Sequence, residues 1–315
     1  MRIGFNTRFR SILADLNRLS SEINLTQLKI SSGKNFLRPS DDPSSVVISL
    51  NYKQGISNIE KYQRAIEDGL SILRSQEATL GNVQNLIARA KVLAIQAAND
   101  TQNAQSRQAI ANEIDGIISA ILSLANSQLG EKYIFAGKKT SGYTSGEKPF
   151  ELVKETLPDP DGQIIEKVVY NGSVEDLEVG YDENLSINLG KSGQKIFIDS
   201  GLFETLLGLK RTLQANNTVD YEKEQYNIQE FIGKLDNVYN YISAERGEIG
   251  SQISHLETKK NLYQDFKETL QINLGNVESA DIAELATKLQ SLTIAYDAAL
   301  RATVMVSDLS LAKYL

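Results

Sequence analysis

Apolar residues near both ends of the chain recur every three or four positions. Near the N-terminus, the steps of three and four run through Phe9, Ile12, Leu16, Leu19, Ile23, Thr26 and Ile30. Near the C-terminus, the same alternation runs through Ile282, Leu285, Leu289, Leu292, Tyr296, Ala299, Thr303 and Val306. This spacing is the a/d pattern of a coiled coil or a helix pair. A stripe this narrow does not stabilise a lone helix in water, so we expect the two ends of the chain to pair.

Helical spacing also covers most of the remaining chain. The five prolines all lie between Pro39 and Pro160, which leaves both ends free to form long helices. A helical stripe begins after Ser44 and continues to about Asn126, with a break at 99–105. Its first part includes Val47, Leu50, Ile56, Ile59, Tyr62, Ile66, Leu70 and Leu73. A shorter helix is predicted over 202–213, and a very long one from about Tyr221 to Leu274.

Between these helical regions the pattern changes to short runs rich in β-forming residues. They are 132–137, 148–153, 163–172, 177–181, 185–190 and 194–199, each bounded by Gly, Pro, Asn or Asp. This pattern predicts an antiparallel β unit of about 70 residues, with a hairpin turn at the PDPDG sequence 158–162. The predicted fold is mainly α with an inserted β domain. We expect an elongated molecule with long antiparallel helices, whose terminal helices pair as a coiled coil.

Charge and composition narrow the possible functions. The net charge of −7 comes from residues 141–200, which hold 12 acidic and 5 basic side chains, while the rest of the chain balances at 28 of each. The chain therefore lacks the general excess of basic residues that is typical of nucleic-acid-binding proteins. No apolar run reaches the roughly 18 residues of a membrane span, so we expect no membrane insertion. The chain has no cysteine and a single histidine, His255, which excludes thiolate metal sites and Cys/His catalysis.

The sequence KISSGKNFLRPSDDPSSV, residues 29–46, contains the strongest candidate for chemistry. Asp41 and Asp42 could form an acid/base pair or ligate a hard metal. The capping interpretation explains more of the pattern. Gly33 fits the position that closes a helix, Asp42 fits the N-cap of the next helix, and Pro43 fits its first turn. We therefore predict that these aspartates cap a helix, that the protein is not an enzyme, and that it holds no cofactor or metal.

Several motifs resemble the flagellin family, in its hook–filament junction branch. They are MRIGFNT at the start, LKISSGKNFLRPSDDPSSVVIS (28–49), LANSQLGEKYIFAGKKT (124–140), SADIAELATKLQ (279–290) and LSLAKYL (309–315). The DDP sequence, the YIFAG sequence and the ending in Tyr-Leu favour the junction branch over filament flagellin. The resemblance is strong over about 1–140 and 240–315, and weak in the acidic β segment.

The resemblance implies a domain arrangement. Residues 1–40 with 280–315 would form a terminal-helix inner domain, 41–131 with 201–279 a helical middle domain, and 132–200 a β-rich outer domain. The terminal helices would be disordered in the free chain and fold on assembly, which delays their ordering cost until the destination. The implied location is the bacterial flagellum, reached through the flagellar export channel without a cleavable signal peptide.

The resemblance also implies a function and partners. The chain would be a structural adaptor that joins the hook-associated proteins at the hook tip to the flagellin filament, by coiled-coil packing of its termini. Its partners would be another hook-associated protein, flagellin, further copies of itself in a ring, and an export chaperone. The predicted assembly stripe consists of Phe9, Ile12, Leu16, Leu19, Ile23, Ile30, Ile282, Leu285, Leu289, Leu292, Tyr296, Ala299 and Val306.

Two alternatives remain open from the sequence. One is a filament-forming flagellin, which self-polymerisation of the purified chain would favour. The other is a carboxylate-dependent hydrolase, in which Asp42→Asn would abolish activity while leaving folding and assembly intact.

Overall fold

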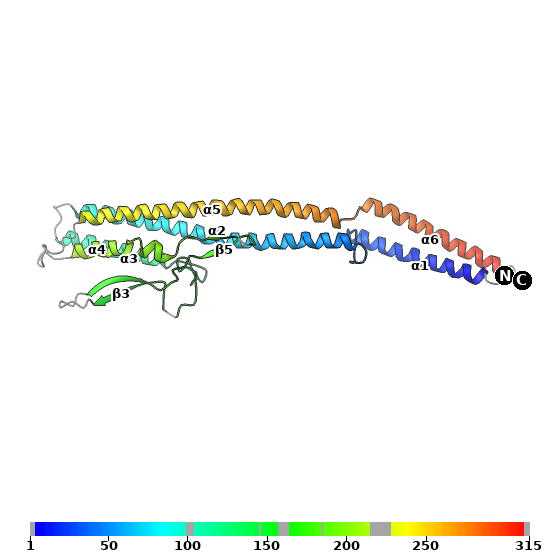
Figure 1. Cartoon of the computed structure of the whole chain (residues 1–315), viewed down its shortest axis with the longest axis horizontal. Coiled ribbons are helices and arrows are strands. Elements are labelled where there is room, and N and C mark those ends of the chain that lie inside the picture. The colour runs from blue at the N-terminus through cyan, green and yellow to red at the C-terminus, as the bar shows by residue number, and fades with distance from the viewer. Residues whose placement is uncertain are drawn as a thin grey trace. The chain divides into compact units, whose positions relative to one another are not determined.

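A computed structural model describes residues 4–98, 104–144, 146–156, 164–183, 185–214 and 228–311 (Figure 1). The fold is mainly helical, with small antiparallel strand pairs, as predicted. The helices are α1 (Gly4–Ser32), α2 (Pro43–Ala97), α3 (Ala104–Ala125), α4 (Leu202–Gln214), α5 (Ile228–Glu278) and α6 (Ile282–Leu311). None of the described helices combines the length and the apolar character that a membrane span requires.

The helices begin and end close to the predicted positions. α2 and α3 lie on either side of the predicted break, and α4 covers the predicted short helix. The long helix α5 continues four residues past its predicted end at Leu274. Its predicted first residues, 221–227, lie outside the described residues.

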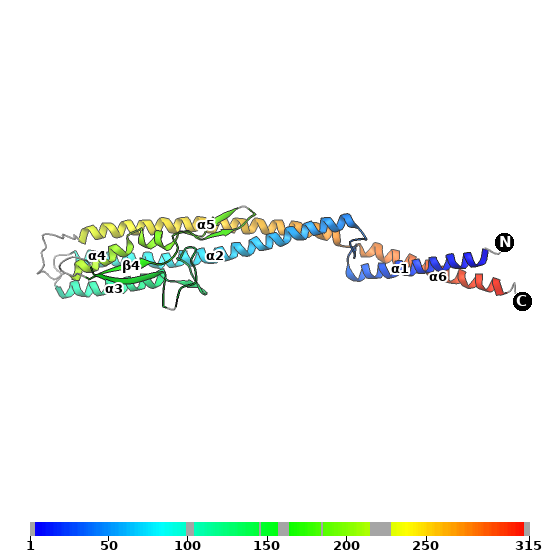
Figure 2. The same cartoon turned by 60° about the horizontal axis from the view of Figure 1, so that its bottom comes forward.

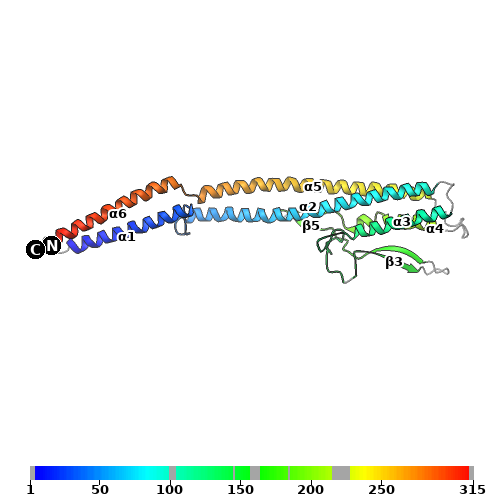
Figure 3. The same cartoon turned by 180° about the vertical axis from the view of Figure 1, so that it is seen from behind.

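The chain divides into two compact units. The first unit combines Met1–Ile59 with Gln264–Leu315, and the second is Glu60–Tyr263. In the first unit, α1 and α6 run antiparallel and side by side along their length (Figures 1, 2 and 3). The two predicted terminal stripes therefore belong to helices that pack against each other.

In the second unit, ion pairs join α2 to α5. Arg74 lies 2.6 Å from Glu257, and Lys260 lies 2.9 Å from Glu67. Arg246 of α5 also donates to Gln84 of α2 at 2.5 Å. The shorter helix α4 packs on α3.

Helix α4 approaches α5 closely at Gly208. A Cβ atom placed there would lie 2.7 Å from the Phe231 ring, a distance that side chains do not tolerate. Glycine at this position therefore allows the close contact of the two helices.

Within the described residues, the strands form three separate two-stranded antiparallel sheets, where the sequence predicted one β unit. The strands are β1 (Gln128–Leu129), β2 (Lys132–Tyr133), β3 (Phe150–Thr156), β4 (Ile164–Tyr170), β5 (Glu178–Gly180) and β6 (Ser186–Asn188). The longest pair, β3 and β4, runs from Phe150 opposite Tyr170 to Thr156 opposite Ile164. The predicted turn at 158–162 lies outside the described residues. A two-stranded sheet is marginal by itself, so each pair depends on the helices that it contacts.

One predicted strand is wrong. Residues 194–199 were expected to be extended, but Gln194–Ile198 forms a short π-helix, closed by the Asp199 N–H donating to the Gln194 carbonyl at 2.9 Å. Burial explains the difference, because Ile196 and Phe197 are fully enclosed. Tertiary packing here overrides the β preference of the local sequence.

Phe197 belongs to an aromatic cluster at the centre of the second unit. Its ring lies 5.0 Å from that of Phe135 and 5.3 Å from that of Phe150, measured between centroids, and both contacts are edge-to-face. Phe203 of α4 and Tyr170 of β4 complete the cluster. The cluster therefore gives β3, β4, the π-helix and α4 a common core.

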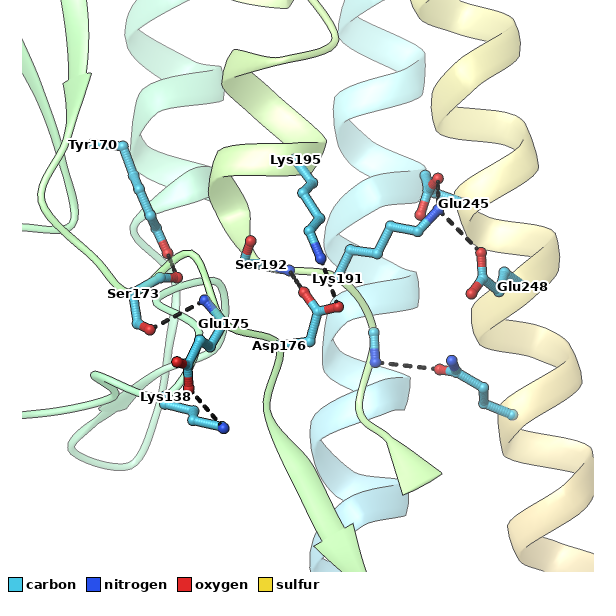
Figure 4. A network of polar contacts seen from close by, with 12 residues as sticks. Lys138, Tyr170, Ser173, Glu175, Asp176, Lys191, Ser192, Lys195, Glu245 and Glu248 are labelled. Atoms are coloured by element: carbon cyan, nitrogen blue, oxygen red, sulfur yellow. Dashed lines mark hydrogen bonds and ion pairs between the residues drawn. The ribbon is translucent and has the colours of Figure 1, made fainter. Parts of the chain in front are cut away.

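Polar contacts fasten the segment that follows β6 to α5 (Figure 4). Lys191 lies 2.6 Å from Glu245 and 3.2 Å from Glu248, both on α5. The hydrogen bond to Glu245 raises the pKa of the Lys191 ammonium, which stays charged at neutral pH. Asp176 accepts hydrogen bonds from the Ser192 N–H and the Lys195 ammonium, each at 2.8 Å.

Candidate assembly surface

On α1, the predicted stripe residues lie on the side of the helix that packs against α6. Leu16 and Leu19 are buried, as is Thr26, while Ile12, Ile23 and Ile30 are half-buried. Phe9 lies within α1, but its side chain is outside the described part of the structure. On α1 the stripe thus forms the inner side of the pair, and its role in assembly remains a prediction.

The stripe of α6 is less enclosed. Leu285, Leu289, Leu292, Tyr296 and Ala299 are all half-buried. Ile282, in the first turn, is 46% exposed, and the side chain of Val306 is outside the described part. A pair of helices covers only one side of each stripe residue, so these side chains retain contact with water.

The first unit also exposes large apolar side chains outside the stripe. We call this set the outer apolar face. It consists of Leu13, Leu25 and Leu28 of α1, Val47, Ile48 and Leu50 of α2, Phe266 and Ile272 of α5, and Ile294, Leu300, Val304 and Met305 of α6. Leu50 is 58% exposed and Ile272 is 65% exposed. Large exposed apolar side chains of this kind are the residues that contact with another protein can bury.

Two members of the outer apolar face were expected elsewhere. The sequence placed Val47 and Leu50 on the same stripe as Ile66 and Leu73. Ile66 and Leu73 are fully buried, whereas Val47 and Leu50 are more than half exposed. The helical period is the same in both places, but the first turns of α2 have no neighbour over this side within the described chain.

Asp41 and Asp42 both accept backbone N–H groups, but only Asp42 does so at the start of a helix. Asp41 accepts the backbone N–H groups of Leu37 and Arg38, both at 3.0 Å. Asp42 accepts the Ser45 N–H at 3.1 Å and the Ser44 hydroxyl at 2.7 Å, so it caps α2. The hydrogen bonds from Ser45 and Ser44 lower the pKa of Asp42 to about 2. These contacts confirm the capping prediction for Asp42, whereas Asp41 binds the connector that precedes α2 and does not cap a helix.

Gly33 ends α1 as predicted, with a φ of 67° that side chains other than glycine rarely adopt. His255, the single histidine, is exposed on α5, and its ring lies 5.6 Å from that of Tyr181. Within the described residues, no group of three or more His, Asp or Glu side chains is arranged to hold a metal ion.

Two carboxylates of the first unit escaped the sequence analysis. Asp281 caps α6 by accepting the N–H groups of Ala283 and Glu284, at 2.9 Å and 3.1 Å. The spacing of Asp281 and Glu284 matches a capping box and could have revealed this cap. Glu278 accepts hydrogen bonds from Ser49 and Lys53 and lies 3.7 Å from Lys34. No local pattern signals Glu278, because its partners are more than 200 residues away in the sequence.

Comparison with known proteins agrees with this architecture. Residues 5–140 match the family model of the bacterial flagellin N-terminal helical region. The chain is 27% identical over 256 residues to flagellar hook-associated protein 3 of Escherichia coli, covering 75% of each chain. It is 24% identical over 296 residues to flagellar hook-associated protein 3 of Salmonella typhimurium, covering 89% of each. The fold resembles the structure of a putative flagellar hook-associated protein from Vibrio parahaemolyticus, with a TM-score of 0.61 and 20% identity over 76% of this chain and 100% of that one.

These findings define the class of protein that the chain resembles, which is the flagellar structural proteins of the flagellin family. Within that family, the predicted resemblance to hook-associated protein 3 is confirmed.

Proposed function

We propose that the chain is a structural adaptor that joins the hook-associated proteins at the hook tip to the flagellin filament. The observation that carries the proposal is the apolar surface of the first unit. The α1 and α6 pair leaves its stripe partly exposed, and further large apolar side chains of the same unit, the outer apolar face, are exposed as well. Burial of such side chains against neighbouring subunits supplies the driving force for assembly, at about 25 cal/mol per Å² of apolar surface.

The proposal includes the predicted domains and partners. Residues 1–40 with 280–315 form the inner domain that packs in the assembly, 41–131 with 201–279 form the middle domain, and 132–200 form the outer domain. The partners are another hook-associated protein on the hook side, flagellin on the filament side, and further copies in a ring. An export chaperone accompanies the chain before it passes through the flagellar export channel.

The proposal can be tested by deleting residues 1–30 of this protein in the cells that produce it. The deletion removes the stripe of α1, and α6 then loses its packing partner. We expect electron microscopy to show hooks without filaments, with flagellin shed into the medium. The purified variant should retain the cooperative thermal transition of the second unit, which contains none of the deleted residues. Normal filaments on these cells would overturn the proposal.

A second candidate function is a filament-forming flagellin. The observation that favours it is the match of residues 5–140 to the family model of the bacterial flagellin N-terminal helical region. Self-polymerisation distinguishes the two functions. A filament protein forms long filaments from the purified full chain, whereas an adaptor requires its partners to add on to a hook tip. Long filaments in the purified protein, seen by electron microscopy, would favour this candidate.

A further inference from the structure

Two connectors of the first unit are bound to each other. The connector between α1 and α2 begins at Gly33, and the connector between α5 and α6 covers 279–281. Lys34 and Ser279 form an antiparallel β-bridge. On either side of it, the Asn35 N–H donates to the Glu278 carbonyl at 2.8 Å, and the Ala280 N–H donates to the Gly33 carbonyl at 2.9 Å. The end of α1 is therefore tied to the beginning of α6.

The Glu278 side chain adds a second tie at the same place. Its carboxylate is 15% exposed and accepts hydrogen bonds from the Ser49 hydroxyl and the Lys53 ammonium of α2. Its other oxygen lies 3.7 Å from the ammonium of Lys34, in the first connector. Hydrogen bonds to a charged group are stronger than those between neutral groups. One carboxylate thus joins α5, α2 and the first connector, and we call this set of contacts the connector clamp.

The clamp joins the end of α1 to the beginning of α6, so it can influence the register in which these two helices pair. In an antiparallel helix pair, the residue numbers of two residues that lie opposite each other add up to the same value along the whole pair. The two stripes match along their whole length when that sum is 315. The matched pairs are Ile30 with Leu285, Thr26 with Leu289, Ile23 with Leu292, Leu19 with Tyr296, Leu16 with Ala299, Ile12 with Thr303 and Phe9 with Val306.

The stripes alone do not select this register. Because their pattern repeats every seven residues, a slip of one heptad aligns apolar residues again. A slip that brings Thr26 opposite Tyr296 still matches Leu16 with Val306, and so on to Ile30 with Leu292. Repetitive sequences of this kind define their register weakly unless another feature fixes it.

We propose that the connector clamp, with Glu278 as its positioning residue, fixes the register in which the terminal helices pair. The bridge of Lys34 with Ser279 has a residue sum of 313, within two of the matched register. A slip of one heptad would change the sum by seven and would break the bridge, both backbone hydrogen bonds and the ion pair with Lys34. The inference goes beyond the adaptor function, since it concerns how one chain aligns its own two ends.

Engineered disulfides can measure the register directly. The chain contains no cysteine, so two introduced thiols are the only ones present. One variant carries Thr26→Cys with Leu289→Cys, which reports the matched register. The other carries Thr26→Cys with Tyr296→Cys, which reports the slipped one. Seven helical residues span about 10 Å, so a single register cannot close both disulfides efficiently. The yield of each intramolecular disulfide is read by peptide mass spectrometry in the full chain after its assembly into flagella, where the terminal helices are expected to be folded, and the sheared flagella are first equilibrated in a glutathione redox buffer.

With the clamp intact, we expect the matched disulfide to exceed the slipped one by at least about tenfold, because slippage loses the two backbone hydrogen bonds of the bridge and the ion pair with Lys34. Glu278→Gln should bring the two yields to within about threefold of each other, since the remaining amide holds Lys34 and Lys53 weakly. Lys53→Met, a change at an exposed partner, should shift the ratio in the same direction by a smaller factor.

Glu268→Gln is the matched control, since Glu268 is exposed on α5 and contacts Gln264 of the same helix. It should leave the ratio of the two disulfides unchanged. Equal yields with the clamp intact would overturn the inference, as would a ratio that Glu278→Gln leaves unaltered. The ratio separates register from stability, because a general loss of helix pairing lowers both disulfides together.

Discussion

The two units of the chain bury their apolar residues in different ways. The second unit encloses a cluster of phenylalanines between helices, short strands and a π-helix, with Phe135, Phe150 and Phe197 fully buried. The first unit is built from helix pairs, and side chains such as Leu50, Ile272 and Met305 are more than half exposed. One unit therefore contains its core within the chain, while the other leaves apolar surface for neighbours. A single chain can thus combine one unit that closes its own core with another that does not.

The largest expected effect comes from removing the same side chain in each unit. Phe197→Ala in the second unit should lower the free energy of unfolding by about 3–5 kcal/mol, because it leaves a cavity in a closed core. Phe266→Ala on the outer apolar face should change it by no more than about 0.5 kcal/mol, because Phe266 is 51% exposed. Chemical denaturation of the purified full chains measures both values. A large loss of stability in Phe266→Ala would show that the first unit also has a closed core.

A charge placed in the stripe should separate assembly from folding. Leu19→Asp puts an unpaired carboxylate on the inner side of the α1 and α6 pair, where Leu19 is buried. We expect incorporation at the hook tip to fall at least about tenfold, which corresponds to about 1.4 kcal/mol. The thermal transition of the second unit should stay unchanged.

Asn17→Asp is the control for that substitution, because it introduces the same charge at an exposed position of the same helix. Quantitative immunoblotting of sheared flagella measures incorporation for both variants. If Leu19→Asp and Asn17→Asp are incorporated to the same extent, the stripe has no part in assembly.

A smaller effect on incorporation is expected from a substitution in the outer apolar face, because one residue contributes only a part of the area that neighbouring subunits would cover. Leu50→Gln should reduce incorporation roughly three- to tenfold, because it removes part of the apolar area buried on assembly. Ile95→Gln is the matched control, since Ile95 is a similarly exposed residue of α2 in the second unit. Equal incorporation of the two variants in sheared flagella would remove the outer apolar face from the assembly surface.

The sequence predicted those parts of the first unit that depend on local patterns. The stripes of α1 and α6 follow from heptad spacing, and the ends of the helices near Gly33 and Asp42 follow from capping preferences. The Glu278 contacts could not be predicted, because its partners Ser49 and Lys53 lie in a distant part of the chain.

In the second unit, the sequence predicted the helices better than the β segment. The runs that form β3 and β4 carry their own alternating pattern, and their pairing needs only a short connection. Ile196 and Phe197 have strong β preference, yet the aromatic cluster accommodates them as a π-helix. This outcome depends on residues from the segment after β2, from β3 and from α4 together, and local sequence patterns do not show which distant residues come together. The exposure of Leu50 is a related case, since periodicity marks an apolar side of a helix without identifying what covers it.

The smallest expected effect concerns the cap of α2, which belongs to the first unit. The pKa of Asp42 is about 2 in the folded chain against an ordinary value of 3.8, because Ser45 and Ser44 donate hydrogen bonds to the charged carboxylate. A carboxylate with a lowered folded-state pKa stabilises the fold above its unfolded-state value, and this contribution is lost as the pH falls from about 4 to about 2. Asp42→Asn retains a capping oxygen but does not ionise, so above pH 4 it should be slightly less stable than the parent chain. The stability difference between the two chains, measured by hydrogen exchange at the Ser45 amide, should shrink as the pH approaches 2. A difference that stays constant down to that pH would show that the charge of Asp42 contributes nothing, and that the first unit closes its helix ends by backbone geometry alone.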